Sequence, residues 1–138
     1  MKISFKNIVF LGKQHSYKIG KNTVVEHSDD NDVLIKRIEY DEFSRDVDSK
    51  TFDKRGNVLE HLHKDYYESE NEEGIIETFK SSTQEYKRKS YTKIENGFKH
   101  FIDDFQSKSG KNYINDFVHD LSGNLIKIIN NKKEFYIR

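Results

Sequence analysis

The chain contains no alanine, and this omission constrains its fold more than any other feature of the sequence. Its apolar side chains include 14 Ile, 7 Val, 10 Phe and 8 Tyr, whereas Leu and Met together number only seven. Alanine and leucine are strong helix formers, while β-branched and aromatic side chains lose rotamer freedom in a helix and pack well on a pleated sheet. The apolar inventory therefore predicts a protein built mainly of β-strands.

Gly and Asn supply the turn signals, because the 138-residue chain has no proline. Both residues accept a positive φ more readily than others do. The segments between these signals have the length of strands, and the clearest examples are 33–40, 58–63, 75–79, 86–92 and 125–129. Short strands at such spacing predict an antiparallel meander, arranged as a sheet or a sandwich with hairpin turns. The length fits one domain, so we expect residues 1–138 to form a single β-rich domain.

One segment has two interpretations. The spacing i, i+3, i+4, i+7 of a helical stripe occurs at Phe98, Phe101, Ile102 and Phe105. A similar pattern follows over 113–121, and together they predict one or two short helices within 97–122. The aromatic content and the turn spacing favour instead two strands paired across Gly110.

Two stretches share a motif: an aromatic residue or His, then Asp, two variable residues, Gly, Asn and two apolar residues. They are 52–59 and 119–126, and 40–47 is a degenerate copy with Ser44 in place of the Gly. An Asp that opens a turn can accept backbone N–H groups further along the chain. A Gly three residues later can adopt the left-handed conformation that ends a type I turn with a G1 bulge. The motif therefore predicts hairpin turns, with structural roles for Asp53, Gly56, Asn57, Asp120, Gly123 and Asn124.

This motif resembles the YD repeats of bacterial Rhs-type polymorphic toxins and related wrapping proteins. Those repeats begin with Tyr-Asp, continue with Gly followed by Asn or Arg, and end on a hydrophobic return strand. The regular period of the family is missing here, since the Asp residues of the three copies lie 12 and then 67 positions apart. The resemblance implies a bacterial polymorphic or contact-dependent toxin system, in which small β-proteins are often immunity proteins. The alternative that it implies is a structural YD-like repeat module acting through strand pairing.

An acidic block with two tyrosines is the sharpest local charge feature of a chain whose net charge is zero. Residues 65–77 carry six acidic residues and no base. The carboxylates of such a block would steer a basic partner, such as a nuclease toxin, and the tyrosines would supply contact area. We therefore expect a protein partner, a cognate toxin domain, to contact Tyr66, Tyr67, Glu68, Glu70, Glu72 and Glu73. The alternative is a solvated hairpin loop whose charges only keep it soluble.

The sequence carries no nucleophile elbow, phosphate-binding loop or dinucleotide motif, and it has no cysteine. His61 and His63 share one face of an expected strand, a spacing that a metal can use, but no third ligand lies nearby in the sequence. A small ribonuclease built on His15 or His119 is a less favoured alternative, because no spacing singles out an acid–base pair. We therefore expect a non-catalytic protein without metal or cofactor.

The balance of 24 basic and 24 acidic residues gives no support to nucleic-acid binding, which normally shows a basic excess. A basic stretch at 86–91 is expected to be a strand rather than a phosphate-binding site. The longest apolar run near the N-terminus, residues 8–11, is too short for a signal peptide or a membrane span. The sequence thus predicts a cytoplasmic protein without a membrane partner, and it leaves the oligomeric state open.

Overall fold

In a computed structural model of the chain, residues 12–137 are described, and they form eleven β-strands and no helix. The predicted mainly β fold with antiparallel hairpins is therefore confirmed. The apolar run at 8–11 lies outside the described residues. The chain divides into two compact units, one that ends at His63 and one that begins at Lys64, and each is described by itself.

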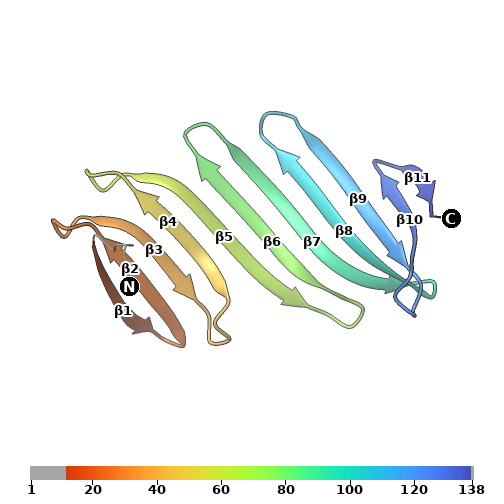
Figure 1. The fold of residues 1–138 in the computed structure, drawn as a ribbon, viewed down its shortest axis with the longest axis horizontal. Coiled ribbons are helices and arrows are strands. Elements are labelled where there is room, and N and C mark those ends of the chain that lie inside the picture. Colours follow the sequence, from red (N-terminus) through yellow and green to blue (C-terminus); the bar gives the residue numbers. More distant parts are fainter. Residues whose placement is uncertain (1–11, 138) are drawn as a thin grey trace, which may run out of the picture. The chain divides into compact units, whose positions relative to one another are not determined.

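The unit that ends at His63 is an antiparallel meander in which each strand pairs with the next one along the chain (Figure 1). Its strands are β1 (Lys13–Ile19), β2 (Asn22–Ser28), β3 (Leu34–Tyr40), β4 (Asp46–Phe52) and β5 (Val58–Glu68), the last of which continues into the second unit. The strands form a single layer. Its most buried side chain is that of Val24, which lies opposite Tyr17 on β1 and Glu39 on β3.

The unit that begins at Lys64 is a second single-layer meander, with the same pairing of consecutive strands (Figure 1). Beyond the end of β5 its strands are β6 (Glu72–Ser81), β7 (Glu85–Glu95), β8 (Phe98–Ser107), β9 (Asn112–His119), β10 (Leu125–Asn130) and β11 (Lys133–Tyr136). The register is regular from β6 to β9, and a bulge interrupts the pairing of β9 with β10.

The same turn geometry recurs in four hairpins, whose turns begin at Asp29, Asp41, Asp53 and Asp120. In each turn the Asp N–H donates to the C=O four residues later at 2.9 Å, and its C=O accepts the N–H three residues later at 3.0 or 3.1 Å. The Asp Oδ1 also accepts the N–H groups two and four residues later, at 2.8 to 3.0 Å. The residue three positions after the Asp has a positive φ, of 64° at Asp32, 63° at Ser44, 85° at Gly56 and 94° at Gly123. The type I turn with a G1 bulge is thus a shared building unit of this chain.

The helical interpretation of 97–122 is wrong, because this segment is the β8–β9 hairpin, turning at Gly110 with a φ of 96°. Side chains alternate along a strand, so Phe101 and Phe105 lie on one face of β8 while Phe98 and Ile102 lie on the other. Both faces therefore carry apolar side chains. Two interleaved apolar rows of this kind imitate the helical spacing in the sequence.

The core is thin. Among the described residues the buried apolar side chains are Val24, Ile102 and Val118, with exposed fractions of 1%, 8% and 2%, and no polar residue is buried. A single layer leaves both faces partly open to water, and this explains why so few side chains are covered. Many large apolar side chains consequently lie at the surface.

Candidate functional site

The six residues expected to contact a partner lie at the end of β5 and the start of β6, within the second unit. Glu68, Glu70 and Glu73 are exposed, whereas Tyr66, Tyr67 and Glu72 are half-buried. The turn between the strands is closed by the Ser69 N–H, which donates to the Glu72 C=O at 2.7 Å. The structure therefore separates this set into exposed carboxylates and side chains that pack on the sheet.

Tyr67 and Glu72 belong to a cluster around Lys89 on β7. The Tyr67 hydroxyl donates to Glu72 Oε2 at 2.6 Å, and Lys89 Nζ lies 3.3 Å from the same oxygen. Lys89 Nζ also lies over the Tyr91 ring at 4.4 Å and the Tyr67 ring at 5.4 Å. Burial and the bond to Glu72 raise the pKa of Tyr67 above its ordinary value, while the same bond and Lys89 lower the pKa of Glu72. The cluster holds the acidic loop against the sheet.

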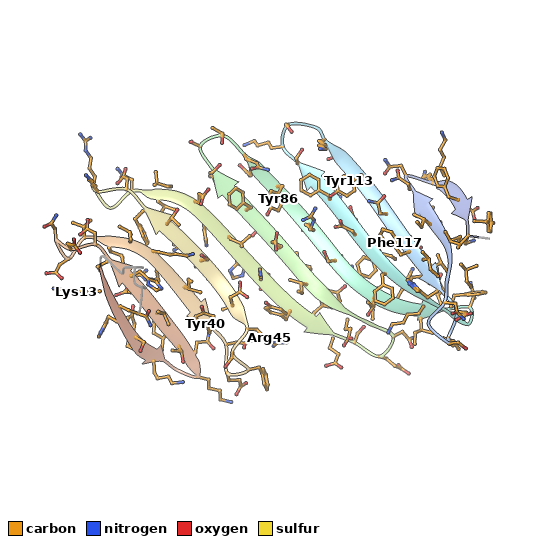
Figure 2. All side chains as sticks on the ribbon, viewed as in Figure 1. Lys13, Tyr40, Arg45, Tyr86, Tyr113 and Phe117 are labelled. Carbon is orange, nitrogen blue, oxygen red and sulfur yellow. The ribbon has the colours of Figure 1, made fainter. Side chains whose placement is uncertain are left out.

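An aromatic ladder crosses four strands of the second unit on the opposite face from Lys89. The ring centroids of Phe79, Tyr86, Phe105 and Tyr113 follow one another at 5.2, 5.2 and 5.1 Å. These residues lie on β6, β7, β8 and β9, and Figure 2 shows Tyr86 and Tyr113 among the side chains of this unit. Stacked cross-strand aromatic pairs stabilise a sheet that lacks a second layer.

Arg88 ties the ladder together. Its guanidinium carbon lies 5.0 Å from the centroid of the Phe105 ring, and its Nη2 donates to the Tyr113 hydroxyl at 2.6 Å. Its Nε lies 3.1 Å from Asp103 Oδ1 in an ion pair. On the same strand as Arg88, burial and the hydrogen bond to Glu77 of β6 raise the pKa of Tyr86 to about 12. The Tyr86 hydroxyl therefore stays protonated near neutral pH.

A second apolar row lies on the same face, further along the strands. It consists of register partners, in the order Phe101 on β8, Phe117 on β9, Ile128 on β10 and Phe135 on β11. The exposed fractions are 38% for Phe101, 38% for Phe117 and 54% for Phe135. We call the ladder and this row together the aromatic face: Phe79, Tyr86, Phe101, Phe105, Tyr113, Phe117, Ile128 and Phe135.

One end of the aromatic face is hollowed. A shallow hollow of about 760 Å³ lies where the β6–β7 and β8–β9 turns meet the ladder. Its floor includes Tyr86 and Tyr113, and its walls carry Ser and Thr hydroxyls together with Lys108 and Lys111. A smaller hollow of about 220 Å³ is lined by the acidic loop together with Lys93 and Lys99. Polar and charged rims therefore border the aromatic face.

In the first unit, the two histidines noted in the sequence meet a carboxylate. His61 Nε2 lies 2.7 Å from Asp48 Oδ1, and His63 Nδ1 lies 3.0 Å from the same atom. Burial works to raise the pKa of Asp48, but the hydrogen bonds to the two imidazoles outweigh it and lower this pKa. Of the other two histidines considered above, His15 packs against Tyr17 and His119 against Phe101.

The aromatic face and the carboxylate partner were both missed by reasoning from the sequence. The only signal for the aromatic face was indirect: Phe101 and Phe105, like Tyr113 and Phe117, are four positions apart and share a face when the segment is a strand. Asp48 precedes His61 by 13 positions, and only the pairing of β4 with β5 brings them together.

No family model, curated protein or solved structure matches this chain. Within residues 12–137 there is no helix that is long and apolar enough to cross a membrane.

Proposed function

We propose that this chain is a non-catalytic cytoplasmic immunity protein that binds and blocks a cognate bacterial toxin domain. The single observation that carries the proposal is the exposed row of Phe101, Phe117 and Phe135 on the aromatic face. The resemblance of its turns to YD repeats supplies the toxin context.

The aromatic face has the composition of a protein-binding surface. Contiguous exposed apolar side chains are uncommon on monomeric proteins and often mark interaction sites. Aromatic residues and Arg are enriched in interface cores, and here Arg88 lies among the rings of the ladder. Because strands and ring stacking hold these side chains in place, little conformational entropy is lost when a partner covers them.

The acidic loop lies beside this face and favours a basic partner. Glu73 is the clearest link, because it lies in the same cross-strand row as Thr92 on β7 and Phe101 on β8. Glu68 and Glu70 are exposed nearby in the β5–β6 turn. Carboxylates at an interface rim steer association, while the apolar centre supplies most of the binding energy. Such an arrangement suits a toxin whose own binding surface is basic, as in a nuclease.

The test measures complex formation between this chain and the toxin domain encoded beside it, by native mass spectrometry and calorimetry. Phe101→Ser and Phe117→Ser should each weaken binding about 30-fold, the effect of losing a hot spot of about 2 kcal/mol. Ile114→Ser is the matched control, because Ile114 is 49% exposed on the opposite face of β9. Absence of a tight complex, together with no protection of cells from the toxin, would overturn the proposal.

The acidic loop is tested separately by neutralising its exposed carboxylates. The triple variant Glu68→Gln, Glu70→Gln, Glu73→Gln should slow association and flatten its dependence on salt, with a smaller effect on dissociation. An unchanged association rate at low salt would remove these residues from the proposal and leave the aromatic face as the binding surface.

A structural repeat module is the second candidate, and the four turns with one shared hydrogen-bond pattern favour it. Such a module would associate through unpaired strand edges. β1 and β11 end the order of the described strands, and every residue of β11 is exposed. Sedimentation at increasing concentration distinguishes the candidates, since a module of this kind forms open-ended polymers and an immunity protein does not.

A further inference from the structure

The pairing of β4 with β5 places three metal-ligating side chains together in the first unit. Asp48 lies directly opposite His63, and His61 lies two residues before His63 on the same strand. Side chains two residues apart point to the same face, and directly paired residues share a face. All three side chains therefore project from one face, and rigid strands rather than loops hold them.

The distances between the donor atoms suit a metal ion. The Nε2 of His61 and the Nδ1 of His63 lie 2.7 and 3.0 Å from Asp48 Oδ1, and the three atoms lie within 4.8 Å of one another. Zinc binds nitrogen and oxygen at about 2.0 to 2.2 Å, so adjacent ligand atoms on one ion are separated by roughly 3 Å. Small rotations of the side chains would thus bring all three atoms onto one ion.

The charges around the cluster indicate which metals fit. From β3, Glu39 lies opposite Asp48, and Arg37 lies opposite Lys50, which in turn lies opposite His61. Arg37 is held by Glu26 in an ion pair of 3.0 Å, and Lys50 offsets part of the charge of the two carboxylates, so general attraction for a divalent cation is modest. Binding must then come from imidazole coordination, which suits Zn²⁺, Ni²⁺, Co²⁺ or Cu²⁺, whereas Ca²⁺ and Mg²⁺ need more oxygen ligands than the one carboxylate here.

We propose that Asp48, His61 and His63 form a binding site for a divalent transition metal such as Zn²⁺, which links β4 to β5. The exposed fractions of the side chains are 23%, 39% and 43%, so water can complete the coordination. The metal replaces the present hydrogen bonds between the imidazoles and the carboxylate, and it requires neutral imidazoles. The site does not depend on the aromatic face and stands whether or not the chain binds a toxin.

The experiment titrates Zn²⁺ and Co²⁺ into the untagged full chain, using calorimetry and the visible absorption of bound Co²⁺. His61→Ala, His63→Ala and Asp48→Asn should each lower the affinity by at least about 10-fold, since even outer-shell changes cost about 10–100-fold. His27→Ala is the matched control: His27 lies on β2 of the same unit, and the register places it on the opposite face from Asp48. Zn²⁺ should also raise the unfolding temperature of the wild type and of this control.

Histidine NMR of the wild type keeps the test independent of whether the variants fold. Of the six histidines, only His61 and His63 should shift strongly when Zn²⁺ is added. Equal Zn²⁺ affinity of the wild type and the His61→Ala, His63→Ala double variant would overturn the proposal. Zn²⁺-induced shifts centred on other histidines would also overturn it.

Discussion

Asn124 donates twice to Asp120: its backbone N–H reaches Oδ1 at 2.9 Å and its side-chain Nδ2 reaches Oδ2 at 3.1 Å. Asn57 makes the same two bonds to Asp53, at 2.9 and 3.1 Å. In the turn that begins at Asp41, the Arg45 Nε replaces the amide and donates to Asp41 Oδ2 at 2.8 Å. In three of the four turns, the side chain of the residue after the Gly position therefore supplies a second donor to the carboxylate, whereas the Asp29 turn has Val33 there and forms only the backbone bonds.

Exchanging the turn residues of two copies should change stability in opposite directions. Ser44 and Gly56 occupy equivalent positions with φ of 63° and 85°, and a left-handed conformation costs a residue with a Cβ about 1–2 kcal/mol. Gly56→Ser should therefore destabilise the protein by about 1 kcal/mol. Ser44→Gly should stabilise it by a smaller amount, because glycine loses more entropy on folding. Thermal and urea unfolding measure both, and shifts of the same sign would contradict the shared geometry.

The turn carboxylates should make stability depend on pH in the acid range. Hydrogen bonds from the backbone and side chain of Asn57 lower the pKa of Asp53 below its ordinary 3.8, and Asn124 does the same for Asp120. A lowered folded-state pKa contributes stability that is present above the ordinary pKa and is lost as the pH falls through the folded-state value. The free energy of unfolding should therefore fall between about pH 4 and pH 2.

Substitution by Asn identifies these groups as the cause. Asp53→Asn and Asp120→Asn should each remove part of the acid dependence in urea titrations. Asp30→Asn is the control, because it also removes one negative charge. Within residues 12–137, the N–H groups of this turn donate to the carboxylate of Asp29 and not to that of Asp30. If Asp30→Asn reduces the pH dependence of the free energy of unfolding as much as the two turn variants do, net charge rather than turn geometry governs this dependence.

Gly74 should not tolerate a side chain, although its φ is not in the left-handed region. A Cβ at this position would lie 2.5 Å from both the Ser90 carbonyl oxygen and the Tyr91 Cβ on β7. Gly74→Ala should therefore destabilise the protein by about 1–3 kcal/mol, the usual cost of overpacking. Lys80→Ala, on the same face of β6 and exposed, should change stability by less than about 0.5 kcal/mol. Urea unfolding compares the two, and equal effects would show that β6 can move away from β7 to make room.

The few buried side chains should matter far more than the exposed ones. Val24→Ala and Val118→Ala each remove two methyl groups from sites that are 1% and 2% exposed, and each should cost about 2 kcal/mol. Val58→Ala removes the same atoms where the side chain is 51% exposed, and it should cost less than about 1 kcal/mol. Similar losses at all three positions in urea unfolding would mean that the strand preference of valine, rather than burial, sets stability.

Much of this fold could be predicted from residue types and turn spacing. The lack of Ala and the abundance of Ile, Val, Phe and Tyr indicated strands, and the Gly56 and Gly123 motifs marked hairpin turns. A turn at 29–31 could also be predicted, but its likeness to the Asp53 and Asp120 turns could not, because Asp32, not Gly, takes the positive φ there. The β8–β9 hairpin was ambiguous because apolar side chains on both faces of one strand hide the period of two.

The surfaces were less accessible to sequence reasoning, because they depend on which strands pair. Tyr67 and Glu72 were expected to face a partner, but Lys89 on the neighbouring β7 binds both of them. Asp48 could not be joined to His61 before the register of β4 with β5 was known. Cross-strand relationships of this kind are set by register, to which a single sequence gives only indirect clues.

Consecutive pairing also has a consequence for synthesis on the ribosome. Within each unit a strand finds its hydrogen-bonding partner in the segment that was made just before it. Contacts so close in sequence carry a small loop-closure cost and favour rapid folding. Each hairpin can therefore close as soon as its second strand leaves the exit tunnel, and the nascent chain need not wait for its C-terminus.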